Sequence, residues 1–133
     1  FFIFNFHPAK IFMGDVGSVF LGCIYSGIVF QSKDIYSFLA VLILATPLYS
    51  DITITIIRRF FNNENIFLAH KKHLFQRLYQ AGWGQNEISS IYILSSFILS
   101  FSLLKFSIFG EIICSLIILL VGIYLEKKYA AKF

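Results

Sequence analysis

Long apolar runs alternate with short polar segments along this 133-residue chain, and the alternation predicts its elements. Four runs are apolar enough to be helices that cross a membrane: residues 16–30, 35–57, 88–104 and 112–125. A helix needs about 20 residues to cross the hydrocarbon layer, so the first and fourth runs need flanking residues to complete them. Open sheets are excluded in lipid, because their edges leave backbone groups without partners. The pattern predicts an all-α, polytopic integral membrane protein with about four transmembrane helices in a single membrane domain.

The polar segments between these runs predict where the chain turns. Residues 31–34 form a short turn, residues 58–87 a long loop, and residues 105–111 a turn with Gly110 in it. Nine basic residues lie before the first run, in the long loop or in the tail, whereas only Lys33 and Lys105 lie on the other side. The positive-inside rule therefore places both ends of this chain and residues 58–87 in the cytoplasm.

The composition agrees with a membrane location. The chain is 58% hydrophobic and 14% charged, whereas soluble domains are about 45–50% apolar and about 25% charged. Its net charge of +4 does not indicate binding to nucleic acid, because the basic residues flank apolar runs. Ser18, Gly22 and Ser26 recur every four residues and could pack against another helix, either in this chain or in a second copy that would make a homodimer.

One carboxylate, Asp15, stands between Gly14 and Gly17 where the first apolar run begins. Glycines let the backbone approach a ligand closely, and a helix that begins here offers phosphate its unpaired N–H groups and the positive end of its dipole. The residues alone leave two interpretations open, a helix N-cap and a ligand or metal site, and the two can coexist.

A second polar group is His70-Lys-Lys-His-Leu-Phe-Gln-Arg77 in the long loop. If this piece is helical, His70, His73 and Arg77 lie within about 60° of one another and form a stripe suited to a diphosphate. The same stripe could rest on lipid head groups as an interfacial helix. The two histidines could also hold a transition metal, although no third ligand lies at a suitable spacing.

Asp51 lies inside the second apolar run, about two turns from its cytoplasmic end. A carboxylate at this depth is costly and is expected to face other helices. Arg58, seven residues later on the same helical face, could pair with it. The two residues are therefore candidates for a structural ion pair or for supporting groups beside an active site.

The sequence Pro8-Ala-Lys-Ile-Phe-Met-Gly-Asp-Val-Gly-Ser18, with Asn5 just before it, resembles the signature of the polyprenyl-phosphate N-acetylhexosamine-1-phosphate transferases. This family includes the phospho-N-acetylmuramoyl-pentapeptide transferases and the enzymes that start O-antigen chains. The His-x-x-His-x-x-x-Arg pattern is similar to the histidine motif of the O-antigen branch, which favours a GlcNAc, QuiNAc or FucNAc donor. The resemblance covers what would be the C-terminal part of such an enzyme.

The resemblance implies that N-acetylhexosamine 1-phosphate is transferred from a UDP-sugar to polyprenyl (undecaprenyl) phosphate, with release of UMP, at the cytoplasmic face of a bacterial inner membrane. It implies that Asp15 is the catalytic residue that contacts Mg²⁺, or Mn²⁺ in its place. It further implies a substrate-binding set of Asn5, Gly14, His70, His73 and Arg77. The partners would be the lipid phosphate, the UDP-sugar and a missing N-terminal half.

The alternative is a non-catalytic membrane module or a truncated relic. Such a scaffold would not need the Gly14-Asp15-Val16-Gly17 cluster together with a histidine loop. A small transporter would need polar residues near the middle of its spans, and Asp51 is the only acid near such a position.

We expect residues 1–133 alone to be inactive. The family also has an Asp-Asp motif and an Asn-rich Asp motif upstream, and no two acidic residues are adjacent anywhere in this sequence. Mg²⁺-dependent release of UMP by the purified chain is the measurement, and robust release would contradict the expectation.

Overall fold

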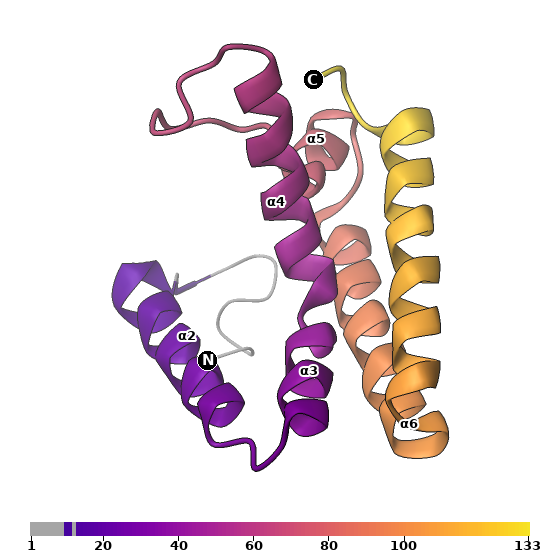
Figure 1. Ribbon diagram of the computed structural model, residues 1–133. Coiled ribbons are helices and arrows are strands. Elements are labelled where there is room, and N and C mark those ends of the chain that lie inside the picture. The colour runs from indigo at the N-terminus through magenta and orange to yellow at the C-terminus, as the bar shows by residue number, and fades with distance from the viewer. Residues whose placement is uncertain (1–9, 12) are drawn as a thin grey trace. The chain divides into compact units, whose positions relative to one another are not determined.

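The computed structural model describes residues 10, 11 and 13–133, and every regular element within them is an α-helix (Figure 1). The predicted all-α class is confirmed for this part of the chain. The chain divides into two units, one up to Leu42 and the other from Ile43 onward. Each unit is described by itself.

The first unit contains α2 (Gly14–Phe30) and most of α3 (Ile35–Leu44). The carboxylate of Asp34 accepts hydrogen bonds from the backbone N–H groups of Tyr36 and Ser37, both at 3.1 Å. The Ser37 hydroxyl donates to the same carboxylate at 2.6 Å and is the main cause that holds the pKa of Asp34 below its ordinary value. Asp34 therefore caps the start of α3.

The apolar run 35–57 is not the single helix that the sequence predicts. The chain breaks at Ala45, between α3 and α4 (Thr46–Phe61). Pro47 explains the break, because it has no N–H group to donate to the carbonyl of Ile43, four residues earlier. The hydroxyl of Thr46 donates to that carbonyl instead, at 2.6 Å.

The second unit consists of α4, α5 (Leu74–Gln80) and α6 (Gln85–Tyr129). A straight helix of the 45 residues in α6 would be about 68 Å long, more than twice the hydrocarbon thickness of about 30 Å. The backbone leaves the helical region at Ser107 (φ 60°, ψ −168°), and Figure 1 shows that the two arms of α6 then lie side by side. The thiol of Cys114 lies 3.4 Å from the Ser102 hydroxyl across this hairpin.

The bend lies within the predicted turn 105–111, but it falls at Ser107 and not at Gly110. Gly110 has another role, because it allows a close approach inside the hairpin. A Cβ atom at this position would lie 2.3 Å from the Cβ of Phe106 and 3.1 Å from the Oγ of Ser102.

The core of the second unit is small. Helices α4 and α5 pack against α6, and Leu78 and Leu99 are buried almost completely. Most of the large apolar side chains on α4 and α6, and on α2 in the first unit, are exposed. Exposed apolar surface of this extent marks contact with lipid or with further protein.

Among the described helices, α6 alone is long and apolar enough to cross a membrane, and α3 with α4 would add a second span if the two are one broken helix. Helix α2, with 17 residues, is shorter than the usual requirement. The count of four transmembrane helices thus stays a prediction.

We predict that Gly110→Ala destabilises the chain by about 1–3 kcal/mol, because the new methyl group would collide with Phe106. Gly122→Ala is the matched control, since nothing lies within 4 Å of a Cβ atom at that position of the same helix. Thermal unfolding in detergent is the measurement. Equal melting temperatures for the two variants would contradict the prediction.

Candidate functional site

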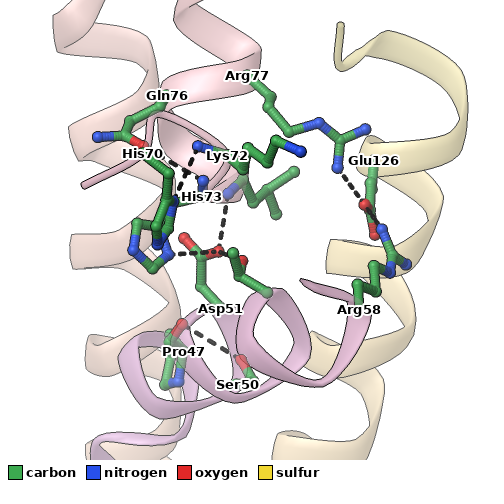
Figure 2. A network of polar contacts seen from close by, with 12 residues as sticks. Pro47, Ser50, Asp51, Arg58, His70, Lys72, His73, Gln76, Arg77 and Glu126 are labelled. Carbon is green, nitrogen blue, oxygen red and sulfur yellow. Dashed lines mark hydrogen bonds and ion pairs between the residues drawn. The ribbon is translucent and has the colours of Figure 1, made fainter. Parts of the chain in front are cut away.

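The carboxylate of Asp51, on α4, has hydrogen-bond partners on both α5 and α6. Figure 2 shows it facing His73 and the start of α5. It is 9% exposed and accepts hydrogen bonds from the backbone N–H of Leu74 at 2.7 Å and from the hydroxyl of Tyr92 at 3.0 Å. Leu74 is the first residue of α5, so Asp51 satisfies an N–H group that the helix itself leaves free. Tyr92 lies on α6, and its bond ties that helix to the same carboxylate.

Asp51 also faces the histidines. The Nδ1 atom of His73 lies 3.6 Å from a carboxylate oxygen of Asp51 and has no hydrogen-bond partner, although it is buried. The ring of His73 is stacked on Phe75, with centroids 5.7 Å apart and planes 8° apart. The stacking on Phe75 and the nearby carboxylate of Asp51 together fix the orientation of the His73 ring.

The second imidazole, His70, lies beside the first, with ring centroids 4.8 Å apart. Its Nδ1 atom accepts a hydrogen bond from the backbone N–H of Lys72 at 3.3 Å, which requires that this atom carry no proton. Desolvation, and then the charge of Arg59, hold the pKa of His70 below its ordinary value, which agrees with a neutral ring. The two histidines therefore form a pair beside Asp51.

The prediction that His70, His73 and Arg77 share one face of a helix is wrong. Helix α5 begins only at Leu74, and His73 is its N-cap in an extended conformation. The side chain of Gln76 accepts the His73 N–H at 3.3 Å, and this bond fixes the start of the helix after the histidines. Arg77, one turn into α5, points away from them towards Glu126, as Figure 2 shows.

Glu126, near the end of α6, is the second junction. One of its oxygens accepts hydrogen bonds from Arg58 of α4 and from Arg77 of α5, and the second arginine is only 6% exposed. The predicted pair of Asp51 and Arg58 is therefore corrected: Arg58 pairs with Glu126, 68 residues away in the sequence. Burial, and then the charge of Arg58, lower the pKa of Arg77 from its ordinary value.

Arg59 shapes the loop that carries the histidines. It is 3% exposed, and its guanidinium donates to the carboxylate of Glu64 and to the backbone carbonyls of Asn65, Ile66 and Leu68. The other carboxylate oxygen of Glu64 accepts from Lys72. From the sequence, Arg59 is first a topology signal and secondly a candidate phosphate contact; in the structure it holds residues 64–68 in one conformation.

The first unit carries the other predicted site. Gly14 begins α2 with a φ of +62°, a conformation that glycine adopts without strain. Asp15 is exposed in the first turn, where the helix dipole favours a negative charge. The N-cap interpretation is wrong, because Met13 holds that position. Asn5 lies outside the described residues.

The described residues contain no group of three or more His, Cys, Asp or Glu side chains that could hold a metal ion. Mg²⁺ usually takes one or two carboxylates, keeps several waters and binds substrate phosphates. Asp15 is an exposed carboxylate, the kind of group that such an ion takes as a ligand.

A cavity of about 520 Å³ lies among α4, α5 and α6 of the second unit. Asp51, Arg77, Tyr92 and Glu126 contribute to its wall, and most of the remaining lining is isoleucine and leucine side chains. The cavity therefore offers an apolar chamber that carries polar and charged groups, an arrangement typical of binding sites for molecules with an apolar body.

Sequence reasoning missed two residues of this site. Tyr92 lies within an apolar run, so in the sequence it looks like an ordinary residue of a membrane-spanning helix. Glu126 lies beside two lysines, so it looks like part of the charged segment that follows such a helix. One signal existed for Glu126, since it is the only acid in the basic tail that follows the last run. No signal in the sequence pointed to Tyr92.

Comparison with known proteins relates the chain to one family. Residues 1–33 match the model described as glycosyl transferase family 4. The chain is 41% identical over 87 residues to the probable undecaprenyl-phosphate N-acetylglucosaminyl 1-phosphate transferase of Bacillus subtilis, a match that covers 62% of this chain and 24% of the relative. It is 30% identical over 95 residues to the phospho-N-acetylmuramoyl-pentapeptide-transferase of Carboxydothermus hydrogenoformans, covering 71% and 28%.

A third relative is the decaprenyl-phosphate N-acetylglucosaminephosphotransferase of Mycobacterium tuberculosis, with 29% identity over 106 residues that cover 68% of this chain and 26% of the relative. The chain thus spans about a quarter of the length of the curated relatives it matches. No solved structure matches it significantly.

We predict that Glu126→Gln destabilises the fold by about 3 kcal/mol, because Arg58 and the buried Arg77 would lose the charge that they share. Glu64→Gln is the control, since that carboxylate is more exposed and Arg59 keeps its three carbonyl acceptors. Denaturant unfolding in detergent measures both variants. An equal loss of stability in both variants would contradict the prediction that the ion pairs of Glu126 with Arg58 and Arg77 stabilise the fold more than those of Glu64.

Proposed function

The chain belongs to glycosyl transferase family 4, and we therefore propose that it forms part of a polyprenyl-phosphate N-acetylhexosamine-1-phosphate transferase. In the proposed reaction, a phosphate oxygen of polyprenyl phosphate attacks the β-phosphorus of a UDP-N-acetylhexosamine. The bond between the β-phosphorus and the bridging oxygen breaks, and UMP leaves. The product is a polyprenyl diphosphate that carries the sugar.

The observation that carries this proposal is the position of the polar cluster on an apolar cavity. Asp51 and Arg77 line the cavity themselves, and His73 lies within 3.6 Å of Asp51. An acceptor that joins a phosphate to a long hydrocarbon chain needs both environments next to each other. The cavity suits the hydrocarbon, and the cations and imidazoles suit the phosphate oxygens.

Each candidate residue has a role in the proposal. Asp15 contributes one carboxylate to a Mg²⁺ ion, which neutralises diphosphate charge when it is bound. His70 and His73 hydrogen-bond phosphate oxygens, and Asp51 acts as a positioning residue that fixes His73 and the start of α5. Arg58 and Arg77 supply positive charge where negative charge develops in the transition state. Asn5 and Gly14 complete the contacts to substrate.

The proposed setting is the cytoplasmic face of a bacterial inner membrane, where UDP-sugars are available to the long loop. The residues that this chain lacks relative to its relatives would supply the remaining acidic groups. An O-antigen role follows only from the form of the histidine motif, and a homodimer only from the small-residue stripe on α2.

We predict that Asp15→Asn in the full-length transferase lowers UMP release by at least about 100-fold, because the amide cannot replace the charge of the carboxylate at a phosphoryl-transfer site. UMP release from UDP-GlcNAc, with undecaprenyl phosphate and Mg²⁺ present, is the measurement.

Asp34→Asn is the matched control, because Asp34 is exposed and its hydrogen bonds are all made to the first turn of α3. That variant should keep its activity. Full activity of Asp15→Asn at normal protein levels would remove Asp15 from the proposed metal contact. Absence of UMP release from the unmodified enzyme with any UDP-N-acetylhexosamine would favour a non-catalytic membrane module.

A further inference from the structure

The ring of Phe133, beyond the end of α6, lies among three cations. Its centroid is 4.7 Å from the Nζ of Lys72, 5.3 Å from the Cζ of Arg77 and 5.8 Å from the Cζ of Arg58. The three cations come from the loop, α5 and α4, so segments that are distant in the sequence converge on one ring. Cation–π contacts of this length are attractive, but each is weaker than a charge-assisted hydrogen bond.

Two hydrogen bonds between Ala131 and Arg77 hold this tail in place. The N–H of Ala131 donates to the carbonyl of Arg77 at 3.2 Å, and the Nε of Arg77 donates to the carbonyl of Ala131 at 2.8 Å. Figure 1 shows the tail, in yellow, at the end of α6 that lies beside α5. The ring is thus brought to the cations by a short strap, residues 130–133, that is bound to α5.

The cations around the ring exceed the carboxylates that pair with them. Arg58 and Arg77 share the carboxylate of Glu126, and Lys72 shares the carboxylate of Glu64 with Arg59, so the three cations at the ring have no carboxylate of their own. Burial, and then the positive charge of Arg58, lower the pKa of Arg77, while the charge of Asp51 raises it. An aromatic face offers only a partial negative charge to this group.

We propose that Arg58, Lys72 and Arg77 form a binding site for a phosphate or diphosphate group, and that the Phe133 strap covers this site and leaves it when the anion binds. Phosphate oxygens make charge-assisted hydrogen bonds with Arg and Lys, which are stronger than cation–π contacts. The side chains of Arg58 and Lys72 are 39% and 33% exposed, so an anion can reach them.

The phosphate could come from the diphosphate of a nucleotide-sugar or from a lipid head group. The first source rests on the proposed function, whereas the site and its strap do not. A binding experiment without catalysis therefore tests the inference separately, and a transferase assay that fails would leave its result unchanged.

The experiment titrates inorganic pyrophosphate into the 133-residue chain in phosphatidylcholine nanodiscs and measures the affinity by calorimetry. Phe133→Ala should bind pyrophosphate about tenfold more tightly than the unmodified chain, because the competing ring is gone. Phe133→Leu, which keeps an apolar side chain without a π face, should show the same gain and guards against misfolding of the first variant. Lys72→Gln added to Phe133→Ala should abolish the gain.

Two variants at the far end of the α6 hairpin serve as controls. Phe109→Ala removes another exposed ring and Lys105→Gln another exposed cation, and neither should change the affinity. If both Phe133 variants bound pyrophosphate no more tightly than the unmodified chain, the proposal that the Phe133 strap covers the site would be contradicted. If the double variant Phe133→Ala and Lys72→Gln bound pyrophosphate as tightly as Phe133→Ala alone, the proposed phosphate site would be contradicted.

Nanodiscs that contain phosphatidylglycerol distinguish the two sources. A lipid head group that occupies the cations would weaken the binding of pyrophosphate to Phe133→Ala, and this result would assign the site to the membrane surface. An unchanged affinity in these nanodiscs would assign it to a soluble diphosphate. Both results support a phosphate site that Phe133 covers.

Discussion

Asp51 is a carboxylate within an apolar helix, and the cost of burying it is offset only where donors from other elements reach it. The donors that reach it are the first N–H of α5 and the hydroxyl of Tyr92 on α6. Helix α5 has only seven residues and is too short to be stable by itself. Its start is therefore set by Asp51 together with the bond between Gln76 and the His73 N–H, and these two contacts also place His73.

Glu126 forms a second junction, so the arginines and the histidines gather at different carboxylates. The imidazoles gather at Asp51, whereas the guanidinium groups of Arg58 and Arg77 gather at Glu126. Helix α5 connects the two junctions, because it begins at one carboxylate and sends Arg77 to the other. A change at either carboxylate is thus expected to reach both the histidines and the cations.

The sequence predicted what depends on local pattern. Apolar runs indicated α2 and both arms of α6, and Asp34 at a turn marked the start of α3. The break at Ala45 was missed although Pro47 signals it, because the apolar run continues through that residue. The partner of Arg58 could not be predicted, since Glu126 lies 68 residues away and only the return of α6 brings the two together. The polar segment 105–111 indicated the bend, but its sequence pointed to Gly110 and not to Ser107 as the residue that leaves the helical conformation.

In this chain the buried charged groups named here have partners, whereas many apolar side chains are not buried. In the second unit, Asp51, Arg59, Arg77 and Glu126 all find partners within the unit, whereas most large apolar side chains of α4 and α6 stay exposed. Polar groups withdrawn from water lose far more free energy per unmade contact than apolar groups left on the surface. These four charged side chains are therefore paired within a chain that spans about a quarter of its relatives, whereas its apolar faces remain for lipid or for further protein to cover.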